Sequence, residues 1–110
     1  MREFVVRIVL AGTLCCLVLS PSLYAQSDVA KIYKTNCVLC HSADGSGDNP
    51  TGKAMHAKDL RSDEVQKQTD AELSEVISKG RGKMPAFGAK IKPDDVQTLV
   101  AYIRSLPSKK

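Results

Sequence analysis

Residues 37–41 read Cys37-Val38-Leu39-Cys40-His41, and this pentapeptide constrains the fold of the chain more than any other feature. Two thiols three positions apart can each add to one vinyl group of a porphyrin, and the imidazole that follows can reach the iron from the same face. The sequence therefore predicts one heme c, attached covalently through Cys37 and Cys40, with His41 as an axial ligand of the iron.

Two other uses of a Cys-x-x-Cys pair fit the sequence less well. A thioredoxin-like redox pair requires a strand–helix–strand pattern around it, and no such pattern is visible. A structural zinc site requires a second pair of Cys or His residues, whereas His56 is the only such residue downstream of His41. Heme attachment is the interpretation that remains.

The N-terminal segment has the pattern of a secretory signal, which we place at residues 1–25. Arg2 and Arg7 supply a positive region, residues 8–19 form an apolar run too short to span a bilayer, and Ala25 offers a small residue for cleavage. Export would place the protein in the periplasm. A membrane association is expected only if this segment is retained as an anchor.

Cys15 and Cys16 belong to the same N-terminal segment and not to the heme motif. Lipid modification would require small residues just before the cysteine, and Leu14 stands before Cys15. We therefore expect the two residues to be discarded with the signal.

The remaining residues, 26–110, fit one monoheme domain, at a size where an all-protein core is only marginally stable. A porphyrin held inside would supplement the core, because the whole chain has only two Phe, three Tyr and no Trp. Without the signal the domain has 14 basic and 11 acidic residues, an excess too small to predict nucleic-acid binding. We expect a monomer.

The apolar pattern is helical throughout and lacks any long two-residue alternation, which predicts an all-α fold. Asp28 is expected to cap a first helix that runs to about Asn36, and the glycine-rich residues 42–58 are expected to form a loop. A short helix is predicted near Ser62. Two further helices are bounded by the Thr69–Glu72 capping box and Gly80, and by Pro93 and Pro107.

Three side chains could supply the second axial ligand of the iron: Met55, His56 and Met84. We favour Met84 because it lies in the glycine-flanked residues 80–88, where a thioether can point toward a buried centre, and because Pro85 stiffens the chain just after it. Met55 is expected to pack in the protein and His56 to lie at the surface or at the heme edge. Met84 is thus the second predicted metal ligand.

Beside the heme motif and the Met84-Pro85 segment, four stretches match a known pattern: Tyr33-Lys34-Thr35-Asn36, Asp44-Gly45-Ser46-Gly47, Lys58-Asp59-Leu60 and Leu99-Val100-Ala101-Tyr102-Ile103-Arg104-Ser105-Leu106. With these, residues 28–106 resemble a class I c-type cytochrome of the small bacterial monoheme type. The resemblance implies the cytochrome c fold, with three to four short helices around one covalently bound heme.

The resemblance also implies particular contacts. In that family the first and last helices cross beside the heme, so Tyr33 is expected to pack against Leu99 and Tyr102. Tyr102 is also counted among the heme-binding residues. The family usually has a glycine where this chain has Val29, which should move the two helices slightly apart. The carbonyl of Pro50 is expected to bond the ring nitrogen of His41 that the iron does not use.

An iron bound by both His41 and Met84 has no open coordination position, and a sulfur ligand raises the reduction potential. This predicts a one-electron carrier between respiratory or dehydrogenase partners, and not an enzyme. Two alternatives stay open: a cytochrome subunit of a larger oxidoreductase complex, and a heme-based ligand sensor or enzyme with an open iron site.

The charges around Met84 are asymmetric. Residues 59–75 carry six acidic residues against two basic ones, whereas residues 79–92 carry no acidic residue. A redox partner with an acidic docking surface would be steered to this basic segment. The cations concerned are Lys79, Arg81, Lys83, Lys90 and Lys92.

Overall fold

The computed structural model describes residues 22–109, with side chains from Asp28 onward. This part of the chain is all-α, as predicted, and its only β-type pairing is an isolated bridge between Arg81 and Met84. Most of the predicted signal, including Cys15 and Cys16, lies outside the described residues. The helices are α2 (Ser22–Asn36), α3 (Val38–His41), α4 (Pro50–Met55), α5 (Asp63–Gln66), α6 (Asp70–Lys79) and α7 (Pro93–Ser105).

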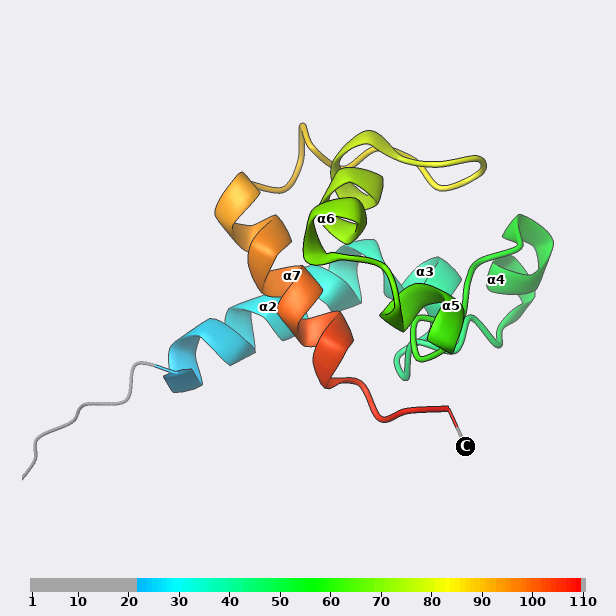
Figure 1. The fold of residues 1–110 in the computed structure, drawn as a ribbon, viewed down its shortest axis with the longest axis horizontal. Coiled ribbons are helices and arrows are strands. Elements are labelled where there is room, and N and C mark those ends of the chain that lie inside the picture. Colours follow the sequence, from blue (N-terminus) through cyan, green and yellow to red (C-terminus); the bar gives the residue numbers. More distant parts are fainter. Residues whose placement is uncertain (1–21, 110) are drawn as a thin grey trace, which may run out of the picture.

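Three longer helices, α2, α6 and α7, build the core (Figure 1). Helix α7 crosses α2 and also packs against α6, so it contacts both of the other long helices. Each helix contributes an apolar stripe at helical spacing, and burial of one such aliphatic side chain is worth about 1.5–3 kcal/mol. The buried residues on these helices are Val29, Tyr33, Leu73, Ile77, Val96, Leu99, Val100 and Ile103.

The ends of α5 and α6 agree with the sequence analysis. The Ser62 hydroxyl accepts a hydrogen bond from the Val65 amide at the start of α5. At the start of α6, the Thr69 hydroxyl accepts from the Glu72 amide, and the Glu72 carboxylate accepts in return from the Thr69 amide. This reciprocal capping box satisfies two amides that have no partner inside the helix. Helix α6 then ends at Gly80, where φ is +76°.

Two local predictions are wrong. Helix α2 begins at Ser22 and not at Asp28, because no glycine or proline interrupts residues 22–28 and Asp28 simply continues the helix. Residues 42–58 are not entirely loop, since α4 occupies residues 50–55. Its start is fixed by Asn49, whose side-chain oxygen accepts from the Gly52 amide at 2.7 Å.

Arg104, near the end of α7, fastens the turn between α5 and α6. Its guanidinium donates to the Gln66 carbonyl at 2.7 Å, to the Gln68 carbonyl, and to the Asp70 carboxylate at 3.0 Å. These bonds hold α5 and the start of α6 against the last helix. Among the helices described between residues 22 and 109, none combines the length and the apolar character that crossing a membrane requires.

Candidate heme site

One cavity of about 650 Å³ gathers the four residues to which the sequence assigns heme binding. Cys37, Cys40, His41 and Met84 all line it. Its volume lies within the roughly 300–1,000 Å³ usual for cofactor sites, and its walls are largely apolar, as a porphyrin requires. The apolar wall includes Tyr33, Leu60, Val65, Leu73, Val76, Ile77, Phe87, Ile91, Leu99 and Ile103.

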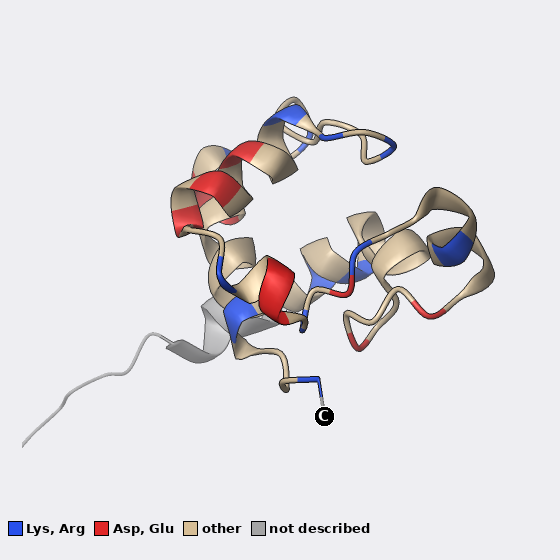
Figure 2. Cartoon of the chain, turned by 45° about the vertical axis from the view of Figure 1, so that its right-hand side comes forward, with Lys and Arg blue, Asp and Glu red and all other residues tan. Residues whose placement is uncertain are grey.

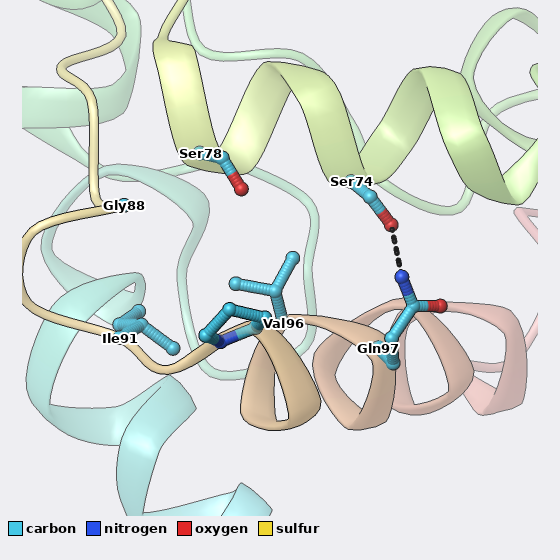
Figure 3. A pocket seen from close by; sticks show the side chains of 7 residues that line it. Ser74, Ser78, Gly88, Ile91, Val96 and Gln97 are labelled. Carbon is cyan, nitrogen blue, oxygen red and sulfur yellow. Dashed lines mark hydrogen bonds between the residues drawn. The ribbon is translucent and has the colours of Figure 1, made fainter.

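A second cavity of about 240 Å³ lies between α6 and α7 (Figure 3). The Gln97 side chain of α7 donates to the Ser74 hydroxyl of α6 at 3.4 Å beside it. None of the four predicted heme-binding residues lines this cavity. The candidate heme site is therefore the larger cavity.

Cys40 lies on the single turn of α3, and Cys37 is the residue that caps its start. The His41 amide donates to the Cys37 carbonyl at 2.8 Å, so the backbone from Cys37 to His41 makes one compact helical turn. No disulfide joins Cys37 and Cys40. Burial, followed by the proximity of Cys40, raises the pKa of Cys37 to about 11.

His41 presents one ring nitrogen to the cavity. Its Nδ1 lies 3.0 Å from the Lys58 carbonyl oxygen, and that bond leaves Nε2 for a metal. Burial lowers the pKa of His41, and the bond to Lys58 opposes this in part. The neutral imidazole favoured by burial is the form that binds iron. The carbonyl expected from Pro50 is replaced by that of Lys58, because Pro50 is the first residue of α4 and lies outside the cavity lining.

The chain that follows His41 is held in one conformation. Ser42 has a φ of +63°, which is unusual for a residue other than glycine. Its carbonyl accepts from the Tyr33 hydroxyl at 2.8 Å, and its hydroxyl accepts from the Asn49 side chain at 2.7 Å. These contacts join α2 and the start of α4 to the residue next to the predicted ligand. They therefore fix the path of the chain directly after His41.

Met84 lies in a tight hairpin that begins where α6 ends. The Met84 amide donates to the Arg81 carbonyl at 2.9 Å, and the Arg81 amide donates to the Met84 carbonyl at 3.1 Å. Farther along, the Phe87 amide donates to the Ile77 carbonyl at 2.9 Å, which ties the segment back to α6. The position of Met84 is thus set by the protein backbone.

The other two ligand candidates also line the cavity but are more exposed. Met55 is the last residue of α4 and is 38% exposed. His56 follows it, is exposed, and has a left-handed φ of +54°. Met84, in contrast, is half-buried and packs against the core. Burial therefore favours Met84 over both alternatives.

Tyr102 does not reach the cavity, contrary to the prediction of a heme-binding role. Its ring packs against Tyr33, as predicted, with ring centroids 5.0 Å apart where α2 and α7 cross. Tyr33 itself lines the cavity, so Tyr102 supports the site through this neighbour. Val29 is buried in the same core, and its effect on the spacing of the helices stays a prediction.

The five predicted docking cations fall into two groups. Arg81, Lys83 and Lys90 line the cavity. Lys79 instead pairs with Glu75 on α6 at 3.2 Å, and Lys92 is the residue before α7. Figure 2 shows basic residues along the segment after α6 and acidic residues along α6 itself. The cationic rim, defined as Arg81, Lys83 and Lys90, is smaller than the sequence indicated.

No group of three or more His, Cys, Asp or Glu residues suited to hold a metal ion occurs within the described residues. The all-α fold, the Cys-x-x-Cys-His turn and the apolar cavity with His41 and Met84 on its walls define a small class I c-type cytochrome.

Residues 25–103 match the sequence family described as cytochrome c oxidase, cbb3-type, subunit III, and the chain belongs to this family. It is 30% identical to cytochrome c6 of Aphanizomenon flos-aquae over 77 residues, which cover 67% of this chain and 82% of that protein. It is 33% identical to cytochrome c6 of a Nostoc species over 85 residues, covering 76% of this chain and 74% of that protein.

A longer relative matches over part of its length. The chain is 35% identical over 84 residues to FixP, a cbb3-type cytochrome c oxidase subunit of Bradyrhizobium diazoefficiens; the match covers 76% of this chain and 28% of FixP. Among solved structures, the c-type cytochrome KustC0563 is 33% identical with a TM-score of 0.62, covering 73% of this chain and 96% of that one. The chain is a c-type cytochrome that carries electrons and is not an enzyme.

Proposed function

We propose that this protein is a periplasmic one-electron carrier with a single heme c, attached through Cys37 and Cys40 and ligated by His41 and Met84. The observation that carries the proposal is that all four side chains line one largely apolar cavity. When bound, the heme supplies the one-electron redox centre. Residues 1–25 would serve as the signal, and residues 26–110 as a monomeric heme domain.

The chain's own residues have separate tasks in this proposal. Lys58 holds the imidazole of His41 through its carbonyl and leaves Nε2 free. The hairpin from Arg81 to Met84 holds the thioether on the cavity wall, and the apolar residues exclude water. With heme bound, His41 and Met84 would together hold its iron and leave no open site for external ligands, which would suit electron transfer.

Spectroscopy of the purified protein tests this proposal. The oxidised form should show the far-red sulfur-to-iron band, and Met84→Ala should abolish that band, lower the potential and let carbon monoxide bind the reduced form. Met55→Ala and His56→Ala are matched controls, because both residues line the same cavity. Loss of the band in either control, with the band retained in Met84→Ala, would show that Met84 is not the ligand.

A second candidate function is a cytochrome subunit within a larger oxidoreductase complex. The match to a part of FixP favours it, because that protein is an oxidase subunit more than three times as long as the matched segment. Fractionation of cells and co-purification distinguish the two. A free carrier is released with the periplasmic contents, whereas a subunit elutes with its partner chains.

A further inference from the structure

Lys83 connects two parts of the molecule that face each other across the heme cavity. Its Nζ donates to the Ala54 carbonyl oxygen, in α4, at 3.2 Å. Both neighbouring elements line the cavity: Met84 follows Lys83 directly, and Met55 follows Ala54. Among the hydrogen bonds of residues 22–109, this is the one that joins residues 80–92 to residues 42–58.

The local charges explain why Lys83 reaches across. Residues 79–92 contain no acidic residue, so the Lys83 ammonium has no carboxylate partner on its own segment. The Ala54 carbonyl lies in the last turn of α4, where carbonyl groups lack the amide partners that a longer helix would provide. A lysine ammonium is a suitable donor to such a carbonyl.

The geometry of the turn presents Lys83 at the edge of the cavity. Gly82 precedes it with a φ of +56°, and no atom lies within 4 Å of the position that a Cβ of Gly82 would take. The turn therefore projects from the protein, and the Arg81–Met84 bridge closes its base. A contact made at the tip of this turn restrains Met84, which is the next residue.

We propose that Lys83 is a positioning residue whose bond to Ala54 closes the mouth of the heme cavity and holds the Met84 hairpin in place. This inference rests on the proposed ligation by Met84. Small external ligands then reach the iron only when the Lys83–Ala54 contact opens together with the hairpin. The contact is exposed, so its opening is frequent and its effect is moderate.

Binding of imidazole to the oxidised protein tests the proposal. Lys83→Met removes the ammonium and keeps an aliphatic chain, and it should raise imidazole affinity about two- to five-fold. Lys79→Met removes the same charge from a residue that pairs with Glu75 and does not line the cavity, so its affinity should equal that of the wild type. Lys83→Arg keeps a hydrogen-bond donor, so its imidazole affinity should be close to that of the wild type.

Hydrogen exchange gives a second readout that does not depend on an added ligand. In Lys83→Met, the amides of Met84 and Phe87, both hydrogen-bonded in the hairpin segment, should exchange faster, while amides within α7 stay unchanged. Equal imidazole affinity and equal exchange in Lys83→Met and the wild type would overturn the role of Lys83. An equal rise of imidazole affinity in Lys79→Met would also overturn it, because it would indicate a general effect of charge.

The two proposals fail in different ways. If the wild type already lacks the sulfur-to-iron band, the ligation by Met84 fails and the role of Lys83 falls with it. If the band is present and Lys83→Met behaves as the wild type, only the role of Lys83 is wrong.

Discussion

A side chain at Gly80 would collide with Met84: an ideal Cβ on Gly80 would lie 2.6 Å from the Met84 carbonyl oxygen. Gly80 also has a φ of +76° and a ψ of +168°, a combination open almost only to glycine. The end of α6 and the hairpin of the proposed ligand therefore depend on the same missing side chain.

Gly80→Ala should consequently destabilise the folded protein by about 2–4 kcal/mol and weaken the sulfur-to-iron band. Gly82→Ala is the matched control, because it also has a positive φ but nothing near its Cβ position, and it should cost about 1 kcal/mol. Urea unfolding and absorption spectra measure both effects. Equal costs for the two variants would show that the contact with Met84 does not matter.

Replacing both Cys37 and Cys40 by Ala should leave an unfolded chain, because the attachment of the heme and much of the core are lost together. Far-ultraviolet circular dichroism of the purified variant measures this. Met84→Ala keeps both cysteines and should stay folded with heme attached. A folded, heme-free double variant would contradict the proposed attachment.

The cationic rim should speed the encounter with an acidic redox partner. Arg81→Glu combined with Lys90→Glu should slow electron transfer at low ionic strength, because both residues line the cavity that a partner would approach. The reduction potential should stay nearly unchanged. Lys79→Glu with Lys92→Glu makes the same change of charge away from the cavity and should slow transfer less. Stopped-flow rates at several salt concentrations compare them, and identical rates would assign the rim to ordinary solvated surface.

The pair of Asp59 and Arg61 should make stability depend on pH. Arg61 donates to the Asp59 carboxylate at 3.0 and 3.1 Å. These hydrogen bonds are the main reason that the pKa of Asp59 lies below its usual 3.8. A carboxyl group whose pKa is lowered by folding stabilises the folded state at pH values above its usual pKa. This contribution is lost as the pH falls through the pKa of the folded state.

The difference in unfolding free energy between the wild type and Asp59→Asn should therefore shrink as pH is lowered below about 5. Urea unfolding at a series of pH values measures it. A difference that stays constant from neutral pH to about pH 3 would show that this carboxylate is not linked to folding.

Much of this fold could be predicted because its signals are local. The capping box of Thr69 and Glu72 and the proline at the start of α7 each act within one helical turn, so a short stretch of sequence contains all the information. The same holds for Cys37, Cys40 and His41, whose spacing alone brings them onto one turn.

The errors concern features that depend on distant residues. The glycine at position 52 suggested a loop, but it lies within α4 because the helix passes close to Cys40, and a Cβ at this position would collide with the Cys40 carbonyl oxygen. The partner of His41 is a carbonyl 17 residues along the chain, which a loop of unknown path cannot specify. The heme-binding role of Tyr102 was inferred from a family resemblance, and Tyr102 does not line the cavity, although its predicted contact with Tyr33 is present.

The hairpin of Met84 has one more consequence, for the relation between redox state and folding. His41 is fixed through α3 and Lys58, whereas Met84 is fixed to the end of α6, so a metal bound to both would cross-link two separately anchored parts of the chain. Such a cross-link exists only in the folded protein, and binding that is specific to the folded state adds to its stability. Since a thioether raises the potential by favouring the reduced iron, the reduced protein should unfold at a higher denaturant concentration than the oxidised one.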